Sequence, residues 1–123
     1  MNRLATAAAL LALAAVPLSA QSGTLDVGDA TIRYEVTGLG SPLVLIHGWA
    51  QDLSIWDREV PVFAREYRVI RYDRRGYGRS TGHADPSADP ADLRGLLRHL
   101  NIRSAPVRGL TTGAARAPRL TPP

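Results

Sequence analysis

Residues 109–113, Gly-Leu-Thr-Thr-Gly, have the glycine spacing of a nucleophile elbow, Gly-Xaa-Ser-Xaa-Gly, with Thr111 at the serine position between Gly109 and Gly113. A hydroxyl held at such a turn attacks a carbonyl carbon once a base removes its proton. The elbow's backbone conformation costs about 1–3 kcal/mol, and a β-branched residue fits it less well than serine does. No Asp, Glu or His follows Thr111, so we expect its hydroxyl to stay protonated.

A second group of residues that can build a site follows an apolar run. It consists of His47, Gly48 and Trp49. We interpret His47 as a side chain that orders this loop through a hydrogen bond, rather than as a catalytic base. The rings of Trp49 and Trp56 are expected to form a pocket wall and part of a helix core, because large aromatic side chains are mostly buried.

A third group lies in residues 73–80, Asp-Arg-Arg-Gly-Tyr-Gly-Arg-Ser. Asp73 and Arg75 are interpreted as residues that hold a turn together. Gly76 and Gly78 allow backbone conformations that a side chain would block. The loop is therefore predicted to order the site rather than to carry its chemistry.

The elements that must position these loops begin with two alternating stretches. Residues 24–27 and 30–37 flank a Gly-Asp turn pair, which predicts an antiparallel hairpin. Arg33 and Glu35 alternate with apolar residues in the second strand. This alternation predicts one solvent-facing side of the hairpin.

Apolar runs predict three more strands and a helix. Residues 43–46 have no polar position, which predicts a buried parallel strand. The other two strands are expected at residues 68–72 and 102–110. A helix is expected to begin at Asp52 or Ser54 as its N-cap, and to restart at Pro61, because proline is tolerated only in the first turn of a helix.

A second helix is expected from Asp89, as its N-cap, to Asn101, as its stop signal. Its apolar residues form one stripe that should face the sheet. They are Leu93, Leu96, Leu97 and Leu100. His83 in the preceding loop and His99 on the helix are expected to be solvated.

The first 20 residues have the layout of a secretory signal peptide. Arg3 gives a positive start, an apolar run follows, and small residues end at Ala20, where cleavage is expected. The alternative, a membrane anchor, needs about 20 apolar residues, and the run is shorter than that. We therefore expect an exported protein, periplasmic or secreted, and since cysteine is absent its domain gains no disulfide.

Composition excludes a disordered or fibrous chain, because 45% of the 123 residues are hydrophobic and 21% are charged. Lysine is absent, so every basic side chain is arginine. Residues 93–123 contain arginines and no acidic residue. One alternative function is therefore binding to an anionic surface, although Trp and Tyr are absent from that region.

The order of these features resembles the α/β-hydrolase fold family: strand, His-Gly loop, helix, strand, Asp-Xaa-Arg-Gly-Xaa-Gly-Xaa-Ser turn, helix, strand and elbow. The residues that carry the resemblance are 43–49, 72–80 and 109–113. It implies the α/β class, with a partial α/β-hydrolase sheet made of an N-terminal hairpin followed by parallel strands with flanking helices. The strand from Leu43 would lie between the strands from Arg68 and Ile102.

The resemblance also implies a domain organisation. Residues 1–20 would be the signal peptide, residues 21–113 the N-terminal part of an α/β-hydrolase domain, and residues 114–123 an irregular tail. The chain would stop before the acid and the histidine of the family's triad. The strand before the elbow would then be an exposed sheet edge, through which self-association is expected.

For chemistry, the resemblance implies an oxyanion hole formed by the main-chain N–H groups of Trp49 and Thr112, with Thr111 at the nucleophile position. The most similar branches are lactonases, esterases, cofactor-free haloperoxidases, epoxide hydrolases and dehalogenases. We therefore predict a hydrolase part that acts on an ester, lactone or similar small substrate, with no cofactor and no metal, and that is incomplete and inactive by itself.

The alternative is a non-catalytic remnant or binding module that keeps the pocket without the triad. In either case the expected partner is a small molecule rather than a nucleic acid. Contact with a membrane is expected only through an uncleaved signal peptide.

Overall fold

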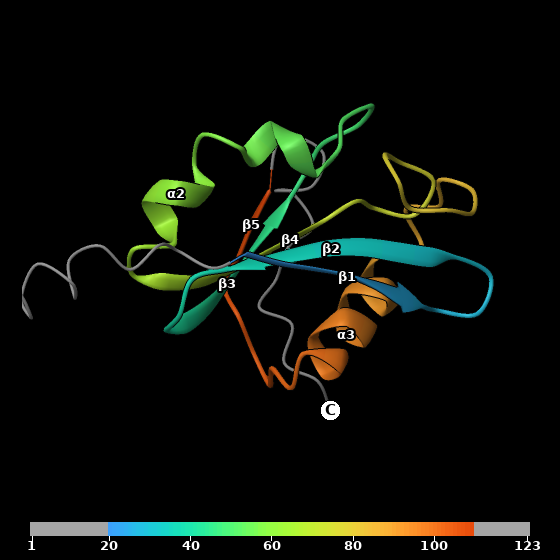
Figure 1. The fold of residues 1–123 in the computed structure, drawn as a ribbon. Helices are drawn as coiled ribbons and strands as arrows, with labels where there is room; N and C mark the ends of the chain where they lie inside the picture. The colour runs from blue at the N-terminus through green and yellow to red at the C-terminus, as the bar shows by residue number, and fades with distance from the viewer. Residues whose placement is uncertain (1–19, 110–123) are drawn as a thin grey trace, which may run out of the picture.

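The structure, a computed structural model, describes residues 20–109. They form one five-stranded sheet of order β1-β2-β4-β3-β5 with helical elements on both of its faces (Figure 1). The strands are β1 (Ala20–Asp26), β2 (Thr31–Thr37), β3 (Ser41–Ile46), β4 (Tyr67–Tyr72) and β5 (Val107–Gly109). The helical elements are η1 (Leu53–Trp56), α2 (Val60–Phe63) and α3 (Asp89–His99). The predicted class, a hairpin followed by parallel strands with flanking helices, is confirmed.

β3 is the central parallel strand, since it pairs in parallel with β4 on one side and with β5 on the other. The chain passes from β3 to β4 through η1 and α2 on one face, and from β4 to β5 through α3 on the opposite face (Figure 1). The predicted position of the strand from Leu43 is therefore confirmed. The carboxyl end of β3 is a topological switch point, which is where ligands bind in open α/β sheets.

The leucine stripe of α3 packs against the sheet as predicted. Leu96 and Leu97 are almost completely buried, and Leu100 is partly buried against the same core. Strand residues complete this core: Ile32, Val36, Val44, Ile46, Ile70 and Tyr72. Burial of this apolar surface is the main force that holds the helix on the sheet.

The opposite face has a smaller core under η1 and α2. Trp56 is buried there with Val60 and Ala64, against Leu43 and Leu45 of the central strand. This confirms Trp56 as a helix-core residue. Within residues 20–109, no helix combines the length and the apolar composition that a membrane crossing needs.

The prediction of one helix after the His47 loop is wrong, because two short helical elements, η1 and α2, occupy this region. Asp52 is the N-cap and accepts a hydrogen bond from the Ser54 N–H, but the element it starts is one turn of 3-10 helix. The predicted restart at Pro61 is confirmed, since Pro61 stands in the first turn of the four-residue α2. Because the chain turns between the two short elements, Ile55 is 42% exposed instead of lying in the core.

The start of α3 also differs from the prediction. Its N-cap is Ala88, which makes no side-chain capping bond, and Asp89 is the first helical residue. The Asp89 carboxylate accepts hydrogen bonds from Arg74 instead. Asn101 does end the helix, with a positive φ of 58°, a conformation that asparagine tolerates better than most residues.

Two strand boundaries shift as well. β1 begins at Ala20 rather than at Thr24, and it pairs with β2 along its whole length. Within residues 20–109, β5 comprises only Val107–Gly109, and Ile102 and Ala105, expected in the same strand, are buried in the α3-side core ahead of it. The predicted signal peptide up to residue 19 and the predicted tail lie outside the described residues.

Candidate active site

The loop that follows β3 is fixed by His47, which is completely buried. Its Nδ1 lies 2.8 Å from the carbonyl oxygen of Gly48, and its Nε2 lies 2.9 Å from the main-chain nitrogen of Arg74. A carbonyl only accepts and an N–H only donates, so the two partners select the neutral imidazole with its proton on Nδ1. Burial is the main cause that lowers the pKa of His47, which favours the same neutral form.

The same loop is closed from its other end by Gln51. The Gly48 N–H donates to Gln51 Oε1 at 2.8 Å. Between these two residues, Ala50 takes a positive φ of 57°, which costs a residue with a Cβ about 1–2 kcal/mol. Trp49, expected to be a pocket wall, is 75% exposed. The loop is therefore a tight, strained turn that holds the Trp49 side chain at the surface.

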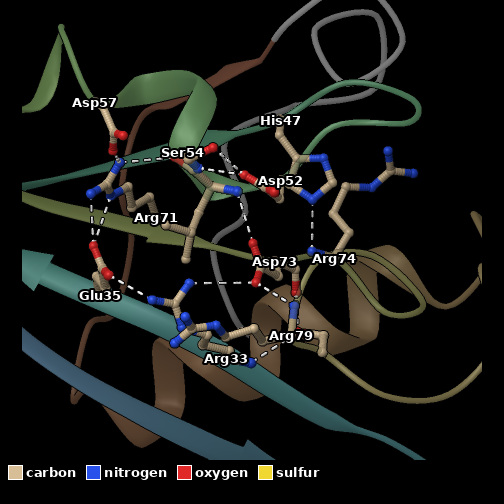
Figure 2. A network of polar contacts seen from close by, with 12 residues as sticks. Arg33, Glu35, His47, Asp52, Ser54, Asp57, Arg71, Asp73, Arg74 and Arg79 are labelled. Atoms are coloured by element: carbon tan, nitrogen blue, oxygen red, sulfur yellow. Dashed lines mark hydrogen bonds and ion pairs between the residues drawn. The ribbon is translucent and has the colours of Figure 1, made fainter.

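The turn after β4 is organised by the buried carboxylate of Asp73. Its Oδ1 accepts from the Leu53 N–H and its Oδ2 from the Arg79 N–H, both at 2.8 Å (Figure 2). Gly78 has a φ of 54° and lies so close to this carboxylate that a side chain on it would collide with Asp73. Ser80 Oγ donates to the Asp73 carbonyl at 2.6 Å. Asp73 thus joins the start of η1 to its own loop.

Two arginines of this turn connect it to other elements. Arg74 donates to Asp89 Oδ2 through Nε at 3.1 Å and through a terminal nitrogen at 2.6 Å, and its guanidinium lies over the Tyr77 ring. Arg75 forms two 2.9 Å hydrogen bonds with the carboxylate of Asp92 on α3. Both arginines therefore tie the turn to the first turn of α3.

Arg75 and Gly76 act farther from the end of β3. The other terminal nitrogen of Arg75 reaches Asp29 in the hairpin turn at 2.7 Å. This hydrogen bond is the main cause that lowers the pKa of Asp29. Gly76 has a φ of 79°, and a Cβ there would meet the backbone of Ala84. Arg75 thus contacts the β1–β2 hairpin turn, and Gly76 packs against the loop that precedes α3.

The predicted solvent-facing side of the hairpin is wrong for β2. Glu35 accepts hydrogen bonds from both Arg33 and Arg71, and Arg71 in turn reaches the carboxylate of Asp57 (Figure 2). The Glu35 and Arg71 side chains are only 17% and 11% exposed. A shallow cleft of about 290 Å³ runs over this polar network. Its charges pair within the protein.

His99 is exposed, as expected. Its Nε2 also lies 3.1 Å from the Tyr34 hydroxyl, and the two rings meet edge to face. His83 is exposed in its loop, as expected. Within the described part of the chain, no three His, Cys, Asp or Glu side chains are placed to hold a metal ion.

The end of β5 lies beside the end of β3, which the His47 loop follows. β5 pairs in parallel with β3, with Gly109 opposite Ile46. Gly109, the first residue of the predicted elbow, therefore lies beside the residue that precedes His47. Thr111, Thr112 and Gly113 lie outside the described residues. Of the predicted site residues, the structure brings together His47, Gly48, Trp49, Asp73, Gly78 and Gly109 at the carboxyl ends of the strands.

Several residues of the site were not anticipated from the sequence. Gln51 lies three residues after Gly48, a spacing that allows a turn-closing bond and was the one available signal. Tyr77 packs edge to face against His47, with ring centres 5.3 Å apart. The Arg74 and Asp89 pair spans 15 positions. Nothing in the local sequence indicates either of these long-range contacts.

Known proteins resemble this chain in sequence and in fold. A family model described as alpha/beta hydrolase fold matches residues 41–107. The chain is 38% identical to a fluoroacetate dehalogenase from a Burkholderia species, over 78% of this chain and 34% of that protein. It is 39% identical to a non-heme chloroperoxidase from Streptomyces lividans, over 79% of this chain and 38% of that protein.

Among solved structures, the enol-lactonase from Burkholderia xenovorans LB400 is similar with a TM-score of 0.69 and 30% identity. That match covers 74% of this chain and 38% of the lactonase. The chain thus spans between 34% and 38% of the length of these relatives.

Proposed function

Because the chain belongs to the α/β-hydrolase fold family, we propose that it is the part of a hydrolase that supplies the oxyanion-hole loop and the sheet beneath it. The substrate class we propose is an ester, a lactone or a similar small molecule. The reaction is attack by a nucleophile at the elbow on the substrate carbonyl. The relatives named above are a dehalogenase, a chloroperoxidase and a lactonase, and the lactonase supports this substrate class.

One observation carries the proposal. The pairing of Ile46 with Gly109 starts the His47 loop and the elbow from adjacent positions on one sheet edge. An oxyanion hole needs two N–H donors aimed at one oxygen beside the nucleophile. In this proposal the donors are the N–H groups of Trp49 and Thr112. Each donor of this kind stabilises the transition state by about 3–4 kcal/mol, measured by its removal.

We further propose that this chain does not turn over substrate unaided. The family's order is nucleophile, acid and histidine, and no Asp, Glu or His follows Thr111 in the sequence. His47 does not replace the missing base, because both of its ring nitrogens already have main-chain partners. The Thr111 hydroxyl therefore keeps its proton near neutral pH.

The second candidate is a non-catalytic binding module. It is favoured by threonine at the nucleophile position, where the elbow motif has serine. Hydrolysis of p-nitrophenyl acetate by the purified protein tests whether the chain has any catalytic activity. Turnover that disappears in Thr111→Ala would contradict both the binding module and our proposal that the chain is inactive unaided.

The catalytic half of the proposal is tested in a hybrid protein. Residues 20–109 replace the matching segment of the Burkholderia xenovorans enol-lactonase, and hydrolysis of its lactone substrate is measured. In the hybrid, Trp49→Pro removes the proposed donor and is expected to lower kcat by about 10²–10³-fold. Trp49→Ala keeps the N–H and serves as the matched control.

The expected pattern is a folded hybrid that hydrolyses lactone, with Trp49→Ala close to the parent rate. If a Trp49→Pro hybrid with an unchanged circular dichroism spectrum hydrolyses lactone as fast as the parent, the oxyanion assignment is wrong. A folded hybrid with no activity in any form would instead favour the binding module.

We also propose that the protein is exported, with cleavage of the leader after Ala20. Amino-terminal sequencing of the exported product should then begin at Gln21. An intact amino terminus at Met1 would contradict export by this route. Because β5 ends the described sheet, we propose self-association through that edge, which size-exclusion chromatography over a range of concentrations tests.

A further inference from the structure

β1 is an outer strand of the sheet, and within residues 20–109 no strand pairs with its outer side. It pairs with β2 over all seven of its residues, from Ala20 opposite Thr37 to Asp26 opposite Thr31. The register is not interrupted by a bulge. β1 is therefore a regular edge, and such an edge offers main-chain N–H and C=O groups to another strand.

The hydrogen bonds of the hairpin and of β2 show which way the main chain faces. At the hairpin turn, the Val27 N–H donates to the Ala30 carbonyl at 2.9 Å. The Arg33 N–H donates to Ser80 Oγ at 2.9 Å, and the Arg33 carbonyl accepts from the Asp73 N–H, also at 2.9 Å. Arg33 therefore directs its main-chain groups toward β4 and away from β1.

These directions alternate along an antiparallel pair, which determines the orientation of every residue of β1. Because Thr24 lies opposite Arg33, the N–H and C=O of Thr24 point away from β2. The same holds for every second residue of the strand: Ala20, Ser22, Thr24 and Asp26. All of them are exposed. The outer edge of β1 thus presents alternating donors and acceptors over its whole length.

β1 also lacks the features that keep edge strands apart. Natural edge strands are protected by lysine, by proline, by a bulge or by being very short. Residues 20–26 are Ala-Gln-Ser-Gly-Thr-Leu-Asp, with no proline and no basic residue. The one charged side chain, Asp26, stands at the end of the strand. A second strand can therefore approach along the whole edge.

We propose that two copies of this chain pair through their β1 strands, antiparallel and about a two-fold axis at Gly23. A two-fold interface uses the same surface on both copies, and two identical antiparallel strands have this symmetry. In this register residue 20 lies opposite residue 26, residue 22 opposite residue 24, and Gly23 opposite its copy. Every residue of β1 then has a partner, whereas a shifted register would leave the strand ends unpaired.

The side chains fit this register. Ser22 of one copy faces Thr24 of the other, and hydroxyl pairs of this kind stabilise neighbouring strands. Asp26 faces Ala20 of the second copy, so the two carboxylates lie at opposite ends of the interface. The two Gly23 residues form a non-hydrogen-bonded pair, in which Cα atoms approach to about 4.5 Å. A residue without a side chain suits that position, where a Cβ would also collide with the Tyr34 ring.

This surface is separate from the proposed active site and from the β5 edge, which lies at the other end of the strand order. Cleavage after Ala20 would remove only the two outermost pairs. Residues 21–25 of one copy would still face residues 25–21 of the other. The pairing of β1 strands therefore does not depend on the proposed function.

Hydrogen exchange, measured by NMR on the full 123-residue chain at increasing concentration, tests the pairing. The amides of Ser22 and Thr24 point away from β2, so they should exchange rapidly in dilute samples and become protected as dimers form. The amides of Gly23 and Leu25 face β2 and are the internal controls, because their protection should not depend on concentration. Ser22 and Thr24 amides that stay unprotected while the chain associates would overturn the proposal.

Thr24→Pro tests the same edge by substitution. It removes an outward N–H and no hydrogen bond to β2, and proline is tolerated at such positions of edge strands. The substitution is present in both copies, so each dimer loses two hydrogen bonds. This loss predicts roughly 5- to 150-fold weaker association in analytical ultracentrifugation. Thr24→Val keeps the N–H and the β-branched shape, and this matched control should associate nearly as strongly as the wild type.

Ser22→Pro provides a second substitution at the position that faces Thr24. Circular dichroism spectra identify the variants that fold like the wild type. If folded proline variants associate as strongly as the wild type, β1 pairing is wrong and association through the β5 edge is favoured. A wild-type chain that sediments as a monomer at every concentration would also contradict the proposal. If neither proline variant folds, the concentration dependence of the Ser22 and Thr24 amides in the wild type decides.

Discussion

Replacing Gly78 with alanine should destabilise the protein much more than the same change at Gly28. Both glycines have positive φ angles, 54° for Gly78 and 101° for Gly28. A Cβ on Gly28 would meet nothing within 4 Å, whereas a Cβ on Gly78 would collide with the carboxylate of Asp73. The pair therefore separates the backbone cost of alanine from the cost of displacing that carboxylate.

The size of the difference follows from the contacts of Asp73. Alanine at a left-handed position costs about 1–2 kcal/mol, part of which is offset because alanine has less freedom to lose on folding than glycine. For Gly28→Ala, this backbone cost is expected to be the whole loss of unfolding free energy. Gly78→Ala also displaces a carboxylate that accepts from the Leu53 and Arg79 N–H groups. Bonds to a charged acceptor contribute about 1.5–3 kcal/mol each, so the total loss is roughly 4 kcal/mol or more.

Urea denaturation of the two variants and the wild-type chain measures these free energies of unfolding. Trimethylamine N-oxide can be added equally to all samples to keep the weaker variant folded. Hydrogen exchange of the Leu53 amide provides a local check, because that amide is bound to Asp73 but is 25 positions from Gly78. Equal losses in the two variants, with Leu53 protection unchanged in Gly78→Ala, would refute the argument from the Asp73 contacts.

Three further predictions rest on other parts of the structure. Since the pKa of His47 is lowered from 6.5, the free energy of unfolding should fall as the pH drops below 6.5, by at most about 1.4 kcal/mol per pH unit, until the folded-state pKa is reached. His47→Asn should flatten this slope, and a slope of opposite sign in urea titrations would contradict the prediction. Leu96→Ala, in the α3-side core, should cost roughly 2–5 kcal/mol, whereas Leu39→Ala, at a side chain 84% exposed, should change stability by less than about 0.5 kcal/mol; thermal melts compare the two. Ala50→Gly should raise stability by roughly 0.5–1 kcal/mol by relieving a positive φ, and a loss of stability in the same melts would show that Ala50 is not strained.

Much of the sheet could be predicted because its signals are local. Residues 43–46 are apolar at every position, and this strand proved to be the buried centre of the parallel sheet. The leucines of α3 repeat at helical spacing, and they face the core. Hydrophobic periodicity reports which side of an element is buried, so both predictions were correct.

The errors occur where a distant partner decides the outcome. Asp89 has the residue type of an N-cap, yet the Arg74 guanidinium 15 positions earlier takes its carboxylate. Glu35 alternates like a solvent-facing residue, yet Arg71 lies opposite it in the paired strand and binds it. Such pairings depend on which elements lie beside each other in the folded chain, whereas hydrophobic periodicity reports only which side of a single element is buried.

Part of the candidate site was predictable because its signals are also local. The His-Gly loop and the turn after β4 were located by their motifs and their positions after strands. The two hydrogen bonds of Gly48 were predicted only in part, because the acceptor that Gln51 provides depends on a turn with a positive φ at Ala50. An alanine gives no sequence signal for that conformation.

The strand order also affects how the chain folds while it is being synthesised. β2 pairs with β1 and with β4, but about 30 residues lie between the end of β2 and the start of β4. A ribosome adds about 5–20 residues per second, so the β1–β2 hairpin waits roughly 1.5–6 s for its next partner. During that time its inner edge is open to chaperones and to other nascent chains. Slow codons between residues 38 and 66 would lengthen this interval without changing a single amino acid.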